Sequence, residues 1–572
     1  METSSYWQAV SQKRLSRRRA LKAGAVGLGV AGLALAGCGG GEEEEAGTPG
    51  AGKTPAGEDS FLTPTGGEET PVYGGHSVSP WNSAFAGLDL HINTDWYGAA
   101  LFHGYLFSID RRNETIELQA AESHEQVDEV THVWKLKQGI KFQNVDPMWG
   151  RELTAEDVVY SFTRRRDEPK VQNDKQLLRD YTAGFEATDK YTFRLATKAP
   201  YSPLMDELEN PSYAIIPREA VEKWGDLQQH GVGFGAYISQ DFSRGERLTF
   251  VKNPDFYMKG LPYIDSGEVL IIPDDSTLNA AFKTGRLDSY WGQPRRPKVD
   301  DWKTIKGIRV RTGNNFWHRT LLIRVDKPPF NDARVRQAID LCIDRQDLID
   351  KLAFGYGSFA GPVVADMTKY ALPQEELRDF YKVDIAQAKQ LLAAAGYENG
   401  LEFELKVENV ADLSKMYQIV AQQLAKAGIN AKLTLQELGI WLTQTLFAGL
   451  ATGQPGNFEM TCYYNLPYAE PDRPLCQWFS KGQAGLSFTG YNNPVADEWI
   501  SKERAEFDPD KRRQIILDAQ RFFITEHGPQ INTMTDVGYG ASWNWVHGVD
   551  ENINRGSFLL LGVHNWLTEK KV

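Results

Sequence analysis

Cysteine and histidine are the residues of this 572-residue chain best suited to catalysis or metal binding, and their spacing points to neither. The ten histidines are scattered from His76 to His564, and the chain contains neither HExxH nor GxSxG. Cys342, Cys462 and Cys476 lack CxxC spacing. Cys462 and Cys476 could pair in an exported protein, whereas Cys342 lies among Ile and Leu residues and is expected to be a buried apolar side chain. The pattern therefore predicts no metal site, no cofactor and no enzyme active site.

The fourth cysteine, Cys38, ends a segment with the composition of an export signal. A basic head precedes an Ala/Gly/Leu/Val run at 23–37, which is too short to span a bilayer. Arg17 and Arg18 lie in a stretch similar to a twin-arginine signal, but Ala20 stands where an aromatic residue is usual, so general secretion stays open. The run closes with Leu-Ala-Gly before Cys38, which resembles a bacterial lipobox. We therefore expect acylated Cys38 to anchor the protein in the lipid bilayer, on the outer face of the cytoplasmic membrane.

Residues 39–75, which follow the signal peptide expected at 1–38, are rich in Gly, Glu, Thr and Pro. This composition cannot bury enough apolar surface to fold, so we expect a disordered tether. The remaining chain has ordinary globular composition and is long enough for several cores. The formal net charge of −13 argues against nucleic acid and against an anionic lipid surface as partners.

Strand and helix patterns alternate through the folded body. A helix is expected to begin after Thr154, with Thr154 and Asp157 forming a capping box. Strand 401–407, helix 414–427 and strand 429–435 form an α/β unit. Other strands are expected at 131–136, 191–195 and 247–252, a short extended segment at 139–142, and helices at 332–342, 344–352 and 386–395.

A series of short sequence motifs over residues 76–560 occurs in an order and at a spacing that are typical of one protein family. They include ELTAEDVVYSFTR (152–164), AIIPREAVEKWG (214–225), GFGAY (233–237), FVKNPDFYMKGLPYID (250–265), GRLDS (285–289), PPFNDARVRQAIDLCIDRQDLI (328–349) and AKQLLAAAGY (388–397). Their order and spacing resemble the extracytoplasmic solute-binding protein family 5 of ABC importers, the oligopeptide, dipeptide and nickel type. The lipoprotein leader agrees, because an importer without an outer-membrane-enclosed periplasm must tether its receptor.

The resemblance implies an α/β fold of the periplasmic-binding-protein type II kind, with two lobes, a hinge and an inserted third domain. The chain would cross between domains I and III near 311–315 and 534–538, and closure about this hinge would bury the ligand. The implied domains are 76–106 with 232–312 and 536–572 (domain I, discontinuous), 107–231 (domain II, the insertion) and 313–535 (domain III).

The resemblance also implies that three segments line the cleft, at 289–292, 314–319 and 460–471. In peptide-binding members, the third segment carries an aspartate that receives the peptide's α-ammonium. Counted back from Glu470, that position falls here on Pro467, which weakens the peptide assignment. The expected ligand-binding residues are Trp291, Asn315, Trp317, Tyr463, Tyr464, Asn465, Tyr468 and Glu470.

Two solute classes stay open. Glu470, Asp472 or Glu459 could take over the ammonium contact, although Glu470 would more often cap the local turn. Alternatively, the aromatic residues stack on an oligosaccharide or other apolar-faced solute, with Asn315 and Asn465 supplying hydrogen bonds. A secreted enzyme or a surface adhesin is the alternative of another class. We expect a monomeric, extracytoplasmic binding protein, not an enzyme, that hands its solute to ABC permease subunits.

Overall fold

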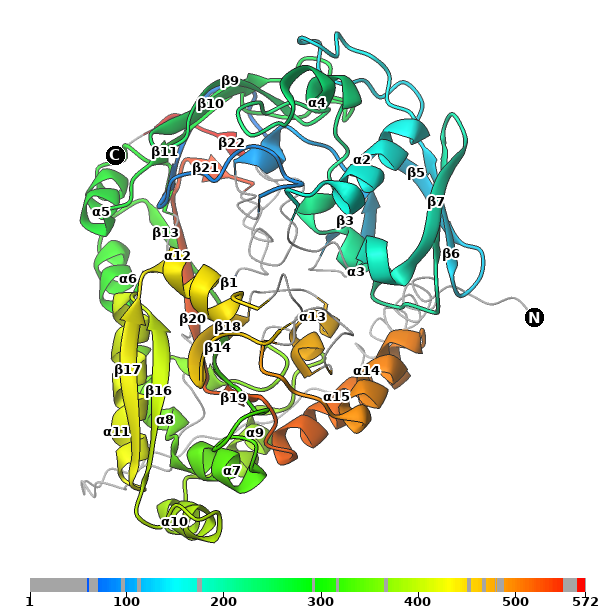
Figure 1. Ribbon diagram of the computed structural model, residues 1–572. Coiled ribbons are helices and arrows are strands. Elements are labelled where there is room, and N and C mark those ends of the chain that lie inside the picture. Colours follow the sequence, from blue (N-terminus) through cyan, green and yellow to red (C-terminus); the bar gives the residue numbers. More distant parts are fainter. Residues whose placement is uncertain are drawn as a thin grey trace, which may run out of the picture.

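The computed structural model shows two lobes, which form the upper and lower halves of Figure 1. It describes residues 59–60, 70–93, 98–110, 115–171, 177–290, 294–314, 318–364, 369–449, 454–465, 470–478, 480, 488–548 and 563–570. In the described part, no helix is both long and apolar enough to cross a membrane. The lobes are α/β in character, with sheets covered by helices.

The first lobe contains two sheets built from segments far apart in the chain. One has the order β2-β11-β10-β9, in which β2 and β11 are parallel. The other has the order β1-β13-β20-β12, beside helices α5 (Asp275–Lys283) and α6 (Arg296–Lys303). The strands are β1 (Asp59–Ser60), β2 (His76–Trp81), β9 (Tyr237–Ser243), β10 (Arg247–Lys252), β11 (Ser266–Ile271), β12 (Ser289–Tyr290), β13 (Ile308–Asn314) and β20 (Met534–Trp543).

A further antiparallel sheet, β5-β6-β8-β7, forms an additional part of the first lobe and packs against helix α2 (Ala155–Asp167). The predicted capping box begins this helix, since the backbone N–H of Thr154 donates to Asp157 Oδ2 at 2.8 Å. The segment expected at 139–142 follows β6 after a turn and pairs with 151–153 through an isolated antiparallel bridge between Lys141 and Glu152. Other elements here are β3 (Phe107–Asp110), β4 (Thr115–Leu118), β5 (Ala121–Gln126), β6 (Thr131–Leu136), β7 (Thr182–Asp189), β8 (Thr192–Thr197), α3 (Leu204–Leu208) and α4 (Arg218–Trp224).

The second lobe is organised on the sheet β17-β16-β18-β14-β19. Strand β16 (Leu401–Glu408) runs parallel to β17 (Ile429–Gln436), and α11 (Ala411–Ala425) connects them, so the predicted α/β unit is confirmed. Alternate residues of β16 are buried because successive side chains of a strand point to opposite faces. The other strands are β14 (His318–Ile323), β18 (Met460–Asn465) and β19 (Gln530–Asn532).

Helices surround this sheet, and their starts follow the predicted caps. Asp332 caps α7 and Asp344 caps α8, each by accepting a backbone N–H. The helices are α7 (Ala333–Cys342), α8 (Arg345–Leu352), α9 (Gln374–Phe380), α10 (Ile385–Ala394), α12 (Leu438–Ile440), α13 (Asp472–Leu475), α14 (Pro494–Ala505) and α15 (Pro509–Thr525).

The three cysteines of the folded body are buried, free thiols. Cys462 Sγ accepts the backbone N–H of Glu408 at 3.3 Å, and Cys476 Sγ donates to the carbonyl of Arg473 at 2.8 Å. The disulfide considered between Cys462 and Cys476 is therefore absent. Cys342 is buried among apolar residues, as expected.

Candidate functional site

Two neighbouring strands carry the chain between the lobes. Strand β13 of the first lobe is followed by β14 of the second, and β19 of the second lobe is followed by β20 of the first. β13 and β20 pair antiparallel, with Asn314 opposite Val537 and Gly313 opposite Gly538. The crossings therefore lie side by side, which is the arrangement about which two rigid lobes can rotate.

Near these crossings, one arginine joins the lobes. Arg295, just before α6, donates from Nε to Asp412 Oδ2 at 2.9 Å, and Asp412 lies in the first turn of α11. The same guanidinium pairs with Asp536 in β20. Arg319 of β14 also approaches Asp536, at 3.5 Å. The carboxyl end of β16, which leads into α11, therefore faces the first lobe.

A second set of contacts joins α13 and α14 to the additional part of the first lobe. Arg473 donates from Nε and Nη2 to the two carboxylate oxygens of Glu207 in α3, both at 2.7 Å, and α3 faces α13 across the middle of Figure 1. These side chains are 13% and 9% exposed. The Ser202 N–H donates to the carbonyl of Arg504 at 2.7 Å, and the Arg504 guanidinium lies over the ring of Tyr181. The lobes are thus in contact at two separate places.

Strand β18 carries the aromatic residues expected to meet the ligand. Tyr463 lies opposite Thr320 of β14, and Tyr464 lies opposite Arg319. The ring of Tyr464 stacks on that of Tyr463, with centroids 6.2 Å apart, and on that of Trp441, at 6.1 Å. The half-buried rings of Tyr463 and Tyr464 offer flat apolar surface to a solute, whereas Trp441 is buried.

Glu470 is buried, and its carboxylate is already engaged. Oε1 accepts the backbone N–H of Asp472 at 3.1 Å, so the turn-capping role is confirmed. Oε2 accepts from Arg512 Nη1 of α15 at 3.2 Å, and Arg512 also pairs with Glu503 at 2.7 Å. Burial raises the pKa of Glu470 to about 7, against the opposing charge of Arg512. These contacts hold the end of the 460–471 segment in place.

The other acids considered as ammonium ligands are engaged as well. Arg504 donates to Asp472 at 2.9 Å, and Glu459 accepts the backbone N–H of Glu404 at 2.7 Å. For Asn465, only the backbone is described, opposite His318. The expected residues Trp291, Asn315, Trp317 and Tyr468, together with Arg17, Arg18 and Cys38, lie outside the described residues.

Sequence reasoning missed one residue beside this strand, Glu408. It ends β16 and is 7% exposed, and no described residue forms a hydrogen bond or ion pair with its carboxylate. The sequence did contain a signal for this residue, because Glu408 is an acid directly after the apolar Val407, at the carboxyl end of a parallel strand. Ligands of α/β sheets commonly bind at the carboxyl ends of the strands.

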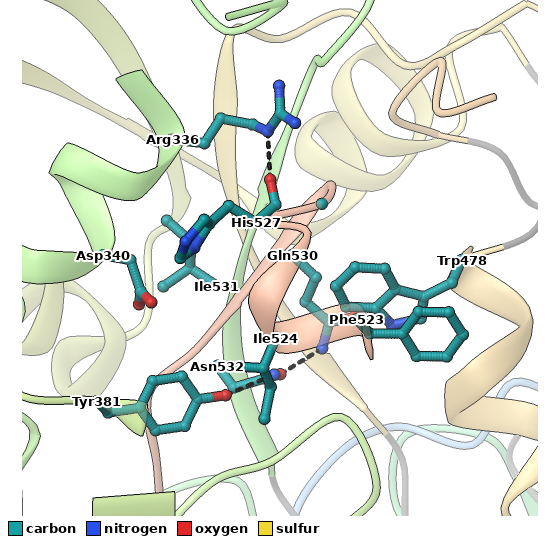
Figure 2. Close-up of a pocket in the computed structure, with 11 residues that line it drawn as sticks. Arg336, Asp340, Tyr381, Trp478, Phe523, Ile524, His527, Gln530, Ile531 and Asn532 are labelled. Carbon is teal, nitrogen blue, oxygen red and sulfur yellow. Dashed lines mark hydrogen bonds between the residues drawn. The ribbon is translucent and has the colours of Figure 1, made fainter. Parts of the chain in front are cut away.

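A small cavity lies inside the second lobe, between α7, α15 and β19. Figure 2 shows Arg336 donating to the carbonyl of His527 and a chain of hydrogen bonds through Gln530, Asn532 and Tyr381. None of the expected ligand-binding residues lines it. Several of its polar groups bond to one another. Within the described ranges, no cluster of His, Cys, Asp and Glu could hold a metal ion.

Comparisons with known proteins agree on one family. Residues 115–486 match the family model described as bacterial extracellular solute-binding proteins, family 5 middle. The glutathione-binding protein GsiB of Shigella flexneri is 29% identical over 447 residues, covering 77% of this chain and 85% of GsiB.

Two solved structures share the fold. The periplasmic binding protein DppA of Helicobacter pylori, in complex with the peptide STSA, superposes with a TM-score of 0.73 at 22% identity, covering 87% of this chain and 99% of DppA. AgaA of A. tumefaciens, in complex with agropinic acid, superposes with a TM-score of 0.74 at 22% identity, covering 87% and 99%. These superpositions, over 87% of this chain, confirm the expected two-lobe fold with an extra domain.

Proposed function

This chain belongs to the bacterial extracellular solute-binding proteins of family 5, and from that premise we propose that it captures a small solute, most simply a peptide, between its lobes. Closure about the hinge buries the solute, and the closed protein delivers it to the permease of an ABC importer. The chain is divided into domain I (76–106, 232–312, 536–572), domain II (107–231) and domain III (313–535). The protein acts as a monomer and makes or breaks no bond.

The side-by-side crossing of β13 and β20 is the observation that carries the proposal. Lobes that are linked covalently through two adjacent strands can separate and close again, and the two sets of contacts between lobes stabilise the closed form. The stacked rings of Tyr463 and Tyr464 support solute contact on the second lobe. We propose that Trp291 and Trp317 complete this aromatic surface.

The relatives bind chemically different solutes, namely glutathione, a peptide and agropinic acid. A second candidate is therefore an oligosaccharide or another apolar-faced solute, which the stacked rings and Pro467 favour. We further propose that acylated Cys38 and the segment after it hold the protein at the outer face of the cytoplasmic membrane, within reach of its permease. The expectation of disorder throughout 39–75 is wrong at Asp59–Ser60, which pair with β13 as strand β1.

Native mass spectrometry of the purified protein tests the proposal. A solute carried through purification should be released on denaturation, and adding it back should raise the melting temperature of the solute-free protein by mass action. The solute should be recovered chemically unchanged. Turnover of the solute would instead indicate an enzyme, and the absence of any stabilising solute in a broad screen would contradict capture.

A further inference from the structure

Glu408 is the last residue of β16, where that strand meets the first lobe. Four residues later, Asp412 pairs with Arg295 of the first lobe. The Glu408 backbone lies beside β18, because its N–H donates to Cys462 Sγ at 3.3 Å. This end of the strand therefore adjoins both the boundary between the lobes and the aromatic residues of β18.

The Glu408 carboxylate stands apart from every other buried acid in the described part of the chain. Nine other carboxylates are buried there, and each has a cationic or backbone donor. Those pairs are Asp89–Arg164, Asp157–Arg151, Glu207–Arg473, Glu209 with the Ile109 N–H, Asp288–Lys570, Glu470–Arg512, Asp472–Arg504, Glu503–Arg512 and Asp536–Arg295. Among the described residues, none supplies a partner to Glu408.

An unpaired carboxylate in such a place is unfavourable for the empty protein. Burial disfavours its charged form, and the neighbouring charge of Glu437 adds to this, so the pKa of Glu408 is raised. Folding does not require an acid here, since it neither caps a helix nor bridges two elements through its side chain. The cost of burying the charged form is offset when a cation binds to the carboxylate or when the carboxylate takes up a proton.

The neighbouring ring indicates which cation suits the position. The Glu408 backbone contacts Cys462 of β18, and Tyr464, whose ring is half-buried, is two residues further along the same strand. A protonated amine can donate charge-assisted hydrogen bonds to a carboxylate while contacting an aromatic face. Glu408 and Tyr464 together offer both.

We propose that Glu408 anchors a protonated primary amine of the solute, with the Tyr464 ring beside it. The proposal rests on the solute-capture function and specifies its substrate class, an amine-bearing solute. The amine belongs to a peptide α-ammonium or to an amino sugar. Glu408 thereby fills the role for which no acid stands at Pro467.

Matched pairs of free and acetylated amines test this assignment by calorimetry on the solute-free protein. The probes are the peptides Ala-Phe and Ala-Phe-Ala with their N-acetyl forms, and the glucosamine dimer with its N-acetylated form. We expect one free amine to bind at least 10-fold more tightly than its acetylated form, and Glu408→Gln to weaken that amine by about 10- to 100-fold. Affinity for the acetylated probe should be unchanged.

Two further variants separate a ligand role from a structural one. Glu404→Gln, on the same strand, removes a carboxylate that accepts from Thr434 Oγ1 at 2.7 Å, and it should leave the amine preference intact. Glu408→Asp keeps the charge and should retain part of the preference. If Glu408→Gln melts below the wild type without solute, a structural role is indicated and the assignment is overturned.

The remaining outcomes divide between this assignment and the proposed function. An amine preference that survives Glu408→Gln overturns the assignment while leaving solute capture intact. Binding only of solutes without an amine, including the co-purified solute, does the same. A wild-type protein that binds no solute at all refutes solute capture and this assignment together.

Discussion

The ion pair between Arg473 and Glu207 yields a quantitative prediction about lobe closure. Both carboxylate oxygens of Glu207 accept from Arg473 at 2.7 Å, and the two side chains are only 13% and 9% exposed. Separation of the lobes would return both groups to water. In the variant Glu207→Gln, Arg473 therefore loses its ionic partner while it is still charged and nearly buried. This penalty applies to the closed form and not to the open form, in which Arg473 is in water.

The size of the effect follows from the burial. Removing one partner of a fully buried ion pair costs about 3–5 kcal/mol. A glutamine side chain can still accept one hydrogen bond and both groups keep slight exposure, so we expect about 2 kcal/mol here. Because 1.4 kcal/mol is a factor of ten, the closed form should lose about 30-fold in population, and the solute dissociation constant should rise by about the same factor.

Calorimetry with the co-purified solute measures this change, and small-angle scattering follows the opening of the lobes. Glu186→Gln is the matched control, since Glu186 and Arg194 form an exposed pair within one sheet, 59% and 43% exposed; it should change the affinity less than twofold. The charge-swapped pair Glu207→Arg with Arg473→Glu should recover part of the loss. Unchanged affinity and unchanged scattering for Glu207→Gln would refute the reasoning.

Three further predictions concern anchoring, protonation and the packing behind the recognition segment. Cys38→Ser should move the protein from the membrane fraction to the soluble fraction, and full membrane retention would contradict lipidation. Burial and the charge of Glu437 raise the pKa of Glu408 in the folded protein above its value of 4.5 in the unfolded chain. The folded protein therefore holds a proton on Glu408 to a higher pH than the unfolded chain does, and it loses stability as the pH rises above 4.5. Glu408→Gln should therefore melt above the wild type at pH 8 and equal it at pH 4; a pH-independent difference would contradict this. Arg512→Met leaves Glu470 and Glu503 buried without their cation and should lower the free energy of unfolding by about 3–5 kcal/mol in denaturant titration. Arg521→Met, in the same helix but half-exposed, should cost under about 1 kcal/mol, and equal losses would contradict the assignment.

The local sequence pattern was sufficient to predict the helices and strands, but not to predict which residues pair with the buried acids. The capping box at Thr154 and the unit from β16 to β17 depend on residues close in sequence, and both are confirmed. Glu470 pairs with Arg512, 42 residues further along the chain, and no local signal predicts such a partner. Glu408 is distinctive because no described residue forms a hydrogen bond or ion pair with its carboxylate, and only the assembled fold reveals that property.

Strand β20 is shared between the two lobes along its length. Its first residues pair with β15 (Gly357–Phe359) of the second lobe, and residues from Val537 onward pair with β13 of the first. A strand with hydrogen-bonded neighbours resists stretching but can twist. Opening would therefore change the twist of β20 between the part paired with β15 and the part paired with β13. The amide protons of β20 should then exchange slowly with deuterium in both the open and the closed protein.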